Sequence, residues 1–379
     1  MWLLTYLAHL YLYWSFRRVV ADRRWRSALI GFLSAITALL LLRNRLFASS
    51  WGAYFSEFLF LWVGCLAFVS SCLIVRDVFR LIAERVAGRT GGIAATLRSR
   101  RCFFAALCAG IAMSAYAVYE ATDVRVTTLT IATNRLPPDV RRLRIAAIAD
   151  FHLHRFSRLS RLESLVGLVN AQQPDVIVML GDFVDTAMSG RGGELAALRA
   201  LDAHAGKYSV IGNHEVYRGI NQSVAFMDAA GFRTLRGEAV EVGGIVVAGV
   251  DDPLVATRKG VPDVLRDTDA ARFVLLLSHR PETPPEARGM FDLQLSGHTH
   301  GGQIWPLRML MRLARGDAVG GYSAPPAAEG GGAGRGAVYV TTGVGYKRPP
   351  MRLFVPPEIV VVDLVREPDG SGKSTPWRQ

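Results

Sequence analysis

The sequence contains few cysteines, and lysine is absent from its first third. The four cysteines form no C-x-x-C pair, which argues against a zinc ribbon or a thioredoxin-like redox site, and all lie in apolar stretches: Cys65, Cys72, Cys102 and Cys108. Residues 1–120 hold no lysine, and their 14 arginines stand against 5 acidic residues, a net charge of +9. The other 259 residues carry 30 basic and 27 acidic groups. The overall charge of +12 is therefore concentrated beside apolar segments, and no nucleic-acid partner is expected.

Half of all residues are hydrophobic, and the mean hydropathy is +0.23, which predicts a membrane part. Four apolar stretches precede a more polar remainder: Met1–Phe16, Ser27–Leu42, about Phe47–Val75, and Cys102–Tyr119. A spanning helix needs about 20 residues, so the first two are slightly short. The third is overlong and contains Glu57, so its membrane core is expected at Phe58–Val75. A cleaved signal peptide is the alternative for the first stretch, but its arginines follow the apolar run instead of preceding it.

The arginines between these stretches predict a topology. The first intervening loop, Arg17–Arg26, carries five arginines, Arg43–Arg45 carries two, and Arg76–Arg101 carries seven. Arginine-rich loops stay in the cytoplasm. Four spans then make a multi-pass protein of the cell (inner) membrane, with the bilayer as a partner and everything after Tyr119 on the periplasmic or extracellular side.

The remainder alternates strand-like and helix-like runs, which is typical of an α/β domain. Predicted strands are Leu143–Ala149, Val176–Leu180, Tyr208–Ile211, Ile245–Val250, Phe273–Leu277, Val338–Val340 and Ile359–Leu364. Predicted helices are Leu159–Asn170, Glu194–His204 and Ser223–Ala230. We therefore expect an all-α transmembrane region at 1–120, a linker at 121–140, an α/β domain at 141–366 and a disordered tail at 367–379. The glycine-rich stretch Gly330–Gly336 is expected to be a mobile loop.

Polar motifs rich in histidine follow several of the predicted strands. They are Asp150-Phe151-His152, Gly181-Asp182, Gly212-Asn213-His214-Glu215, His279 and Gly297-His298-Thr299-His300. Residues two apart in an extended segment share a face, and the carboxyl ends of strands in an α/β sheet meet at one edge. Each motif alone is weak, but the ordered set predicts a site for two cations. Mixed oxygen and imidazole ligands suit Mn, Fe, Zn or Co better than Mg or Ca.

The ordered set resembles the calcineurin-like metallophosphoesterase superfamily, and in particular its membrane-attached bacterial branch. The resemblance is carried by Ser296-Gly297-His298-Thr299-His300-Gly301-Gly302-Gln303 and by the closing Pro357-Glu358-Ile359, and covers about residues 140–365. It implies a four-layer αββα sandwich and a metal-dependent phosphoesterase. The expected reaction is hydrolysis of a phosphoester or pyrophosphate bond, with attack by a hydroxide that bridges two divalent metals.

The resemblance also implies a role for each motif residue. One metal would be bound by Asp150, His152 and His300, the other by Asn213, His279 and His298, and Asp182 would bridge them. The catalytic residue His214 would face the substrate and assist at the leaving oxygen, oriented by Asp185. Phosphoprotein phosphatases of the superfamily continue with Arg-Gly after this aspartate. Here Thr186-Ala187 follows, so that activity is not expected.

The sequence leaves the substrate and the roles of a few residues undecided. The membrane region favours a lipid-linked phosphate. The alternatives are small soluble phosphodiesters, or a nucleotide-linked diacyl sugar if the domain is cytoplasmic. His154 either touches substrate or lies behind the ligands, and His204 is interpreted as structural. The basic run Lys347–Arg352 either holds phosphate or is a solvated loop. The segment Leu307–Arg315 is either an interfacial basic helix or a surface helix covering the core.

Two other functional classes are disfavoured. A catalytically dead phosphate-binding module would lack a metal ligand, and none is missing from the motif set. A transporter or channel would need polar groups within the membrane, where Glu57 is the one acid.

Overall fold

The computed structural model describes residues 2–46, 50–89, 91–154, 157–256, 258–323 and 335–367. The chain forms two compact units. The first comprises Met1–Glu120 with Arg348–Leu353, and the second comprises Ala121–Lys347 with Phe354–Gln379. The tail predicted beyond Glu367, and most of the loop predicted at Gly330–Gly336, lie outside the described residues.

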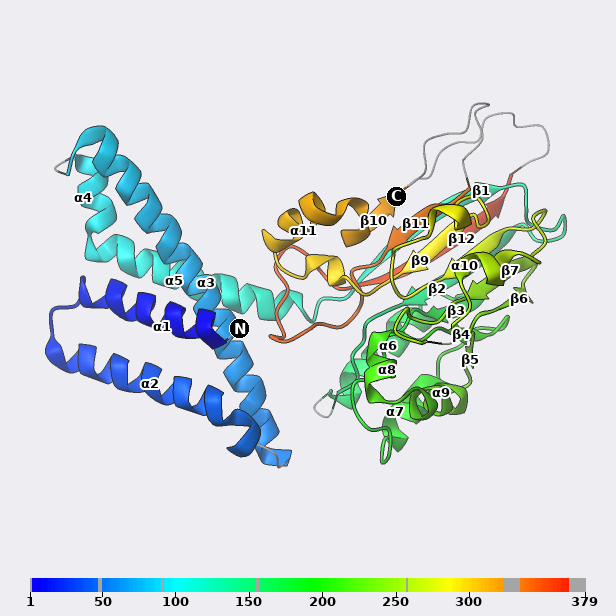
Figure 1. The fold of residues 1–379 in the computed structure, drawn as a ribbon, viewed down its shortest axis with the longest axis horizontal. Helices are drawn as coiled ribbons and strands as arrows, with labels where there is room; N and C mark the ends of the chain where they lie inside the picture. The colour runs from blue at the N-terminus through cyan, green and yellow to red at the C-terminus, as the bar shows by residue number, and fades with distance from the viewer. Residues whose placement is uncertain are drawn as a thin grey trace. The chain divides into compact units, whose positions relative to one another are not determined.

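The first unit is helical (Figure 1). Its helices are α1 (Trp2–Arg17), α2 (Arg23–Leu46), α3 (Ser50–Ala87), α4 (Gly92–Arg98) and α5 (Arg100–Glu120). In the described part of the chain, three segments are long and apolar enough to cross a membrane: Arg23–Leu42, Phe55–Ala87 and Arg100–Glu120. Helix α1 has 16 residues, fewer than the roughly 20 that a span needs. Three of the four predicted apolar stretches therefore lie in helices of spanning length, and the first does not.

The basic segment at 348–353 packs inside the first unit. Arg348 Nε lies 2.9 Å from Glu57 Oε1, so the acid of the third apolar stretch has a cationic partner. The Arg352 side chain is fully buried, and its backbone N–H donates to the Ala117 carbonyl at 2.8 Å. The solvated-loop interpretation was therefore wrong for Arg352, whereas Arg348 is exposed and pairs with Glu57.

The second unit contains two six-stranded sheets. The first runs in the order β1 (Arg125–Thr133), β12 (Glu358–Arg366), β2 (Arg142–Ile148), β3 (Val176–Met179), β4 (Lys207–Ser209) and β5 (Arg233–Thr234). The second runs β10 (Gly321–Ser323), β11 (Ala337–Val340), β9 (Leu293–Ser296), β8 (Val274–Leu277), β7 (Ile245–Gly249) and β6 (Glu238–Val242). Strands β2 to β5 are mutually parallel, as are β7, β8, β9 and β11.

The two sheets pack face to face, and helices cover their outer faces. The central core takes side chains from both sheets, among them Ile145, Val178, Leu275 and Leu295. The outer face of the first sheet is covered by α6 (Leu159–Asn170), α7 (Gly192–Arg199) and α9 (Ile220–Ala229) (Figure 1). On the outer face of the second sheet lie α10 (Val261–Leu265) and the 3₁₀ helix η1 (Pro285–Ala287). The predicted α/β class and αββα layering are confirmed.

The segment predicted as a linker at 121–140 contains a strand, so this prediction was wrong. Strand β1 pairs in parallel with β12 over nine residues, from Arg125 opposite Glu358 to Thr133 opposite Arg366. It is an edge strand in which Leu129 and Ile131 alone are buried. Two buried residues give little apolar periodicity, and the partner strand lies more than two hundred positions away.

The predicted helix Glu194–His204 ends earlier than expected. Helix α7 stops at Arg199, and the His204 side chain is 77% exposed in the following turn, 3.6 Å from Asp175. His204 is therefore not at a helix C-terminus, although it is remote from any metal-ligand cluster among the described residues.

Candidate metal centre

The motif residues lie at the carboxyl ends of parallel strands from both sheets. Asp150 and His152 follow β2, Asp182 follows β3, and Asn213 begins α8 (Asn213–Arg218) after β4. His279 follows β8, and His298 and His300 follow β9. Five of these residues have positive φ between 50° and 71°: Asp150, His152, Asp182, His298 and His300. Such backbone is strained for side chains other than glycine and is concentrated at functional sites.

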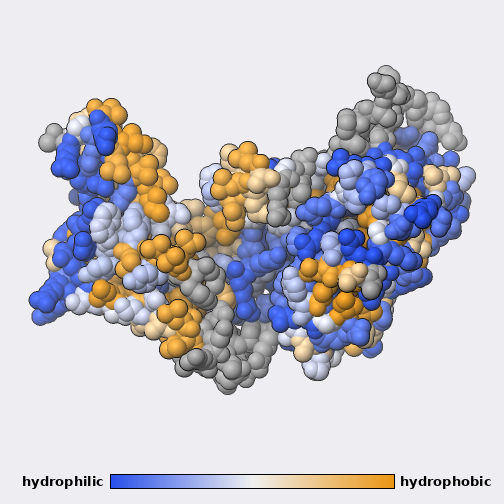
Figure 2. Space-filling model, in the orientation of Figure 1, coloured by the Kyte–Doolittle hydropathy of each residue, from blue (hydrophilic) through white to orange (hydrophobic). Residues whose placement is uncertain are grey.

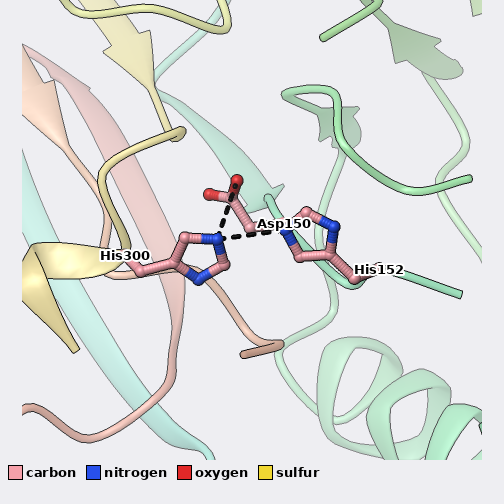
Figure 3. Close-up of side chains that lie close together, drawn as sticks. All are labelled: Asp150, His152 and His300. Atoms are coloured by element: carbon pink, nitrogen blue, oxygen red, sulfur yellow. Dashed lines mark hydrogen bonds and ion pairs between the residues drawn. The ribbon is translucent and has the colours of Figure 1, made fainter. Parts of the chain in front are cut away.

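Three of these side chains converge on one point (Figure 3). The ligand atoms of Asp150, His152 and His300 all lie within 4.8 Å of one another. His300 Nε2 is 3.0 Å from His152 Nε2 and 3.7 Å from Asp150 Oδ1. All three side chains are almost fully buried, so their polar atoms face each other and not bulk water.

A second cluster joins Asp182, His279 and His298, again within 4.8 Å. Asp182 Oδ2 lies 3.2 Å from His279 Nε2, which in turn lies 3.2 Å from His298 Nδ1. The same carboxylate oxygen is 4.0 Å from His152 Nε2 of the first cluster. Asp182 therefore lies between the two clusters.

The donor atoms of these clusters suit a cation. The His279–Asp182 pair can also share a proton, because burial lowers the pKa of His279 but the charge of Asp182 outweighs burial and raises this pKa to about 9. His279 Nδ1–H donates to the Leu180 carbonyl at 2.8 Å, so in the neutral ring Nε2 carries a lone pair. That lone pair faces the Asp182 carboxylate, and two acceptors at this distance repel unless a proton or cation lies between them. Asn213 Oδ1 is also buried and accepts no hydrogen bond from any described residue. Burial lowers the pKa of His152 and of His298 to about 3, so both rings are neutral and can ligate metal.

His214 is held beside these clusters by a carboxylate. Its Nδ1–H donates to Asp185 Oδ1 at 3.0 Å, and its Nε2 lies 4.0 Å from Asp182 Oδ2. Burial lowers the pKa of His214, but the hydrogen bond with Asp185 and the charge of Asp182 outweigh it and raise the pKa above its ordinary value. Arg218, one turn further along α8, donates to the same Asp185 oxygen at 3.1 Å. Sequence reasoning missed Arg218, although its i, i+4 spacing from His214 was a usable signal.

Glu215 is a second residue to which the sequence analysis assigned no role. Its buried carboxylate accepts hydrogen bonds from the backbone N–H groups of Asp182, Val184 and Gly212, at 2.8–2.9 Å. A side chain at Gly212 would collide with Asp182 Oδ1, so glycine is required where this backbone passes the carboxylate. Glu215 and Gly212 together fix the position of Asp182.

A cavity of about 410 Å³ opens beside the clusters. It is lined by His298, Thr299, His300, Gly302, Gln303, Met311 and Lys347. Lys347 brings a positive charge to its lining. Its backbone exchanges two hydrogen bonds with the Gln303 side chain, at 2.7 and 2.9 Å. His154 is half-buried and belongs to none of the described ligand clusters.

This chain is similar in sequence to known proteins. The profile of the calcineurin-like phosphoesterase family matches residues 143–302. An uncharacterized metallophosphoesterase of Aquifex aeolicus is 37% identical over 269 residues, covering 67% of this chain and 97% of the relative. One of Campylobacter jejuni is 30% identical, covering 67% and 68%. A transmembrane protein with metallophosphoesterase domain of Bos taurus is 31% identical, covering 64% and 57%. This relative and the three apolar helices indicate membrane association.

Proposed function

Because the chain belongs to the calcineurin-like phosphoesterase family, we propose that it is a membrane-anchored phosphohydrolase that uses two divalent metals. The observation that carries the proposal is the position of Asp182. One oxygen of this carboxylate faces both His279, at 3.2 Å, and His152, at 4.0 Å, which belong to different clusters. A carboxylate in that position suits two cations that share it as a ligand.

The ligands divide between two sites in this proposal. Asp150, His152 and His300 would hold one cation, Asn213, His279 and His298 would hold the other, and Asp182 would contribute to both sites. Bound cations of this kind neutralise charge on phosphoryl oxygens and activate water as a nucleophile. The oxygen and imidazole donors are compatible with Mn, Fe, Zn or Co.

His214 is the proposed catalytic residue. Its Nδ1–H is committed to Asp185, so the ring is held with Nε2 directed away from this carboxylate. A proton on Nε2 can then be donated to the leaving oxygen as the phosphorus–oxygen bond breaks. The raised pKa of His214 supports this role, since it keeps more of the ring protonated near neutral pH.

The substrate is proposed to be a lipid-linked phosphoester or pyrophosphate. Three apolar helices of spanning length and the arginine counts of the first 120 residues support a multi-pass protein with its phosphoesterase domain on the periplasmic or extracellular side. On that side, polyprenyl pyrophosphates, phospholipids and exported phosphodiesters are within reach. Small soluble phosphodiesters are the second candidate class. A nucleotide-linked diacyl sugar becomes the candidate only for a cytoplasmic domain.

The test is a substrate and metal screen with the purified full-length protein. Chelation should abolish hydrolysis, and Mn, Fe, Zn or Co, added singly, should restore it. Polyprenyl pyrophosphate, phospholipid and a soluble model diester are then compared with the metal that restores most activity. Hydrolysis that survives complete metal removal, or no hydrolysis of any phosphate compound with two metals bound, would refute the proposal.

A further inference from the structure

Helix α11 (Leu307–Arg315) exposes its apolar side. Leu307 is 50% exposed, Met309 56%, Leu310 60% and Leu313 78%. Figure 2 shows these hydrophobic side chains gathered over α11 as one patch. We call Leu307, Met309, Leu310 and Leu313 the α11 apolar face.

Arg308 and Arg312 of α11 occupy the opposite side. Arg312 Nη2 donates to the Gly320 carbonyl at 2.8 Å, so this side chain is directed toward its own domain. Arg308 is about half-buried, and burial lowers the pKa of its guanidinium. A surface helix of a soluble protein normally places its apolar stripe against the core and its charges in water. Here the order is reversed, so of the two alternatives for Leu307–Arg315 the surface helix that covers the core with its apolar side does not fit.

Aromatic side chains extend the apolar face at the start of the helix. Trp305 is 50% exposed and Phe354 59%, and their rings meet edge to face with centroids 6.4 Å apart. Exposed tryptophan beside aliphatic residues is typical of surfaces at the membrane–water interface. The sequence of α11 contains no acidic residue, so no side chain of this helix repels anionic lipid headgroups.

We propose that α11 docks on the lipid bilayer, with Leu310 and Leu313 inserted among the lipids. The bilayer is the partner proposed for the α11 apolar face, because three helices of spanning length would hold the domain next to a membrane. The docking goes beyond the proposed reaction and does not depend on it. Met311, on the same helix, lines the cavity beside His298 and His300, so the docked helix forms a wall of the candidate site.

The experiment places a photoreactive residue on the apolar face. Benzoylphenylalanine replaces Leu313 in the full-length protein, which is reconstituted in vesicles with roughly one-third anionic phosphatidylglycerol. The matched control carries the same residue in place of Leu168, a 37% exposed leucine on helix α6. After illumination, mass spectrometry distinguishes adducts with lipid, with a second copy and within the chain.

The docking predicts a lipid adduct yield at position 313 about ten-fold above that at position 168. Leu310→Glu places a carboxylate within the apolar face and should lower the yield at position 313 several-fold, whereas Leu168→Glu should not change it. Both variants should unfold at the temperature of the parent protein. Equal lipid yields at positions 313 and 168 would overturn the proposal. So would adducts at position 313 that are mainly with a second copy or within the chain.

Discussion

The carboxylate of Glu215 accepts a hydrogen bond from the backbone N–H of Asp182, at 2.9 Å. The same carboxylate also accepts from Gly212 and Val184, so it joins the loop after β3 to the loop after β4. These two loops carry Asp182 and Asn213, which come from different strands. Glu215 therefore acts through the backbone to set the distance between proposed ligands of the two cations.

Replacement of Glu215 by alanine should destabilise the phosphoesterase domain. It leaves three buried N–H groups without an acceptor, at about 1–3 kcal/mol each, so the free energy of unfolding should fall by about 3 kcal/mol or more. Thermal unfolding of the purified protein, followed by circular dichroism, measures this change. Glu163→Ala, an exposed position on α6, is the control and should have almost no effect. Equal stability of the two variants would show that Glu215 does not hold these loops.

His214→Ala should preserve metal binding and slow hydrolysis. The expected loss in kcat is roughly 10²–10⁴-fold, the usual contribution of a general acid. The loss should shrink for a substrate whose leaving group is p-nitrophenol, because such a group departs without a proton. Metal content is measured by elemental analysis beside the rates. Loss of metal in this variant would instead make His214 a ligand.

Asp185→Asn tests the orientation of His214 separately. The amide removes the charge that raises the pKa of His214 and alters its hydrogen bond, while both metals should remain bound. We expect a rate loss of roughly 10–100-fold, smaller than that of His214→Ala, since the ring is still present. The double variant should be no slower than His214→Ala alone. If the two losses multiply, Asp185 acts independently of His214.

Much of the α/β domain could be predicted from sequence because its central strands are continuous apolar runs. The runs beginning at Leu143, Val176 and Phe273 correspond to β2, β3 and β8, and the helix predicted at Leu159–Asn170 is α6. Strands β1, β5, β6, β9 and β10 were missed, and β1 and β9 show why. One is a half-exposed edge strand, and the other, Leu293–Ser296, is four residues long with a buried polar Gln294. Short-range patterns do not identify such strands, since pairing with distant partners stabilises them.

The candidate metal ligands were easier to predict from sequence than the residues that position them. Asp150, Asp182 and His279 could be named because ligand types stand at strand ends, where a sheet brings them together. Glu215 and Arg218 act on backbone groups and on Asp185, which are contacts that no local pattern specifies. For a similar reason, the sequence left two alternatives open for α11, an interfacial helix or a surface helix that covers the core. Periodicity shows that a helix has two sides, but it does not show which side faces the domain.

The membrane topology is a separate prediction. The arginine-rich loops should stay in the cytoplasm and place the phosphoesterase domain outside. This placement does not require the 16-residue α1 to span, because the three longer helices alone would export the chain beyond Glu120. C-terminal fusions to alkaline phosphatase and to a fluorescent protein that matures in the cytoplasm measure the orientation in cells. An active phosphatase fusion with a dark fluorescent fusion is expected, and the reverse pattern would move the domain to the cytoplasm.

The most direct test of the two-metal account is the metal content of Asp182→Asn. This carboxylate faces both clusters, at 3.2 Å from His279 and 4.0 Å from His152. The parent protein, reconstituted and freed of loose metal, should bind two ions per chain. The variant should bind clearly fewer than two, and hydrolysis of a model diester should be lost. Two ions per chain together with near-normal turnover in Asp182→Asn would contradict the account.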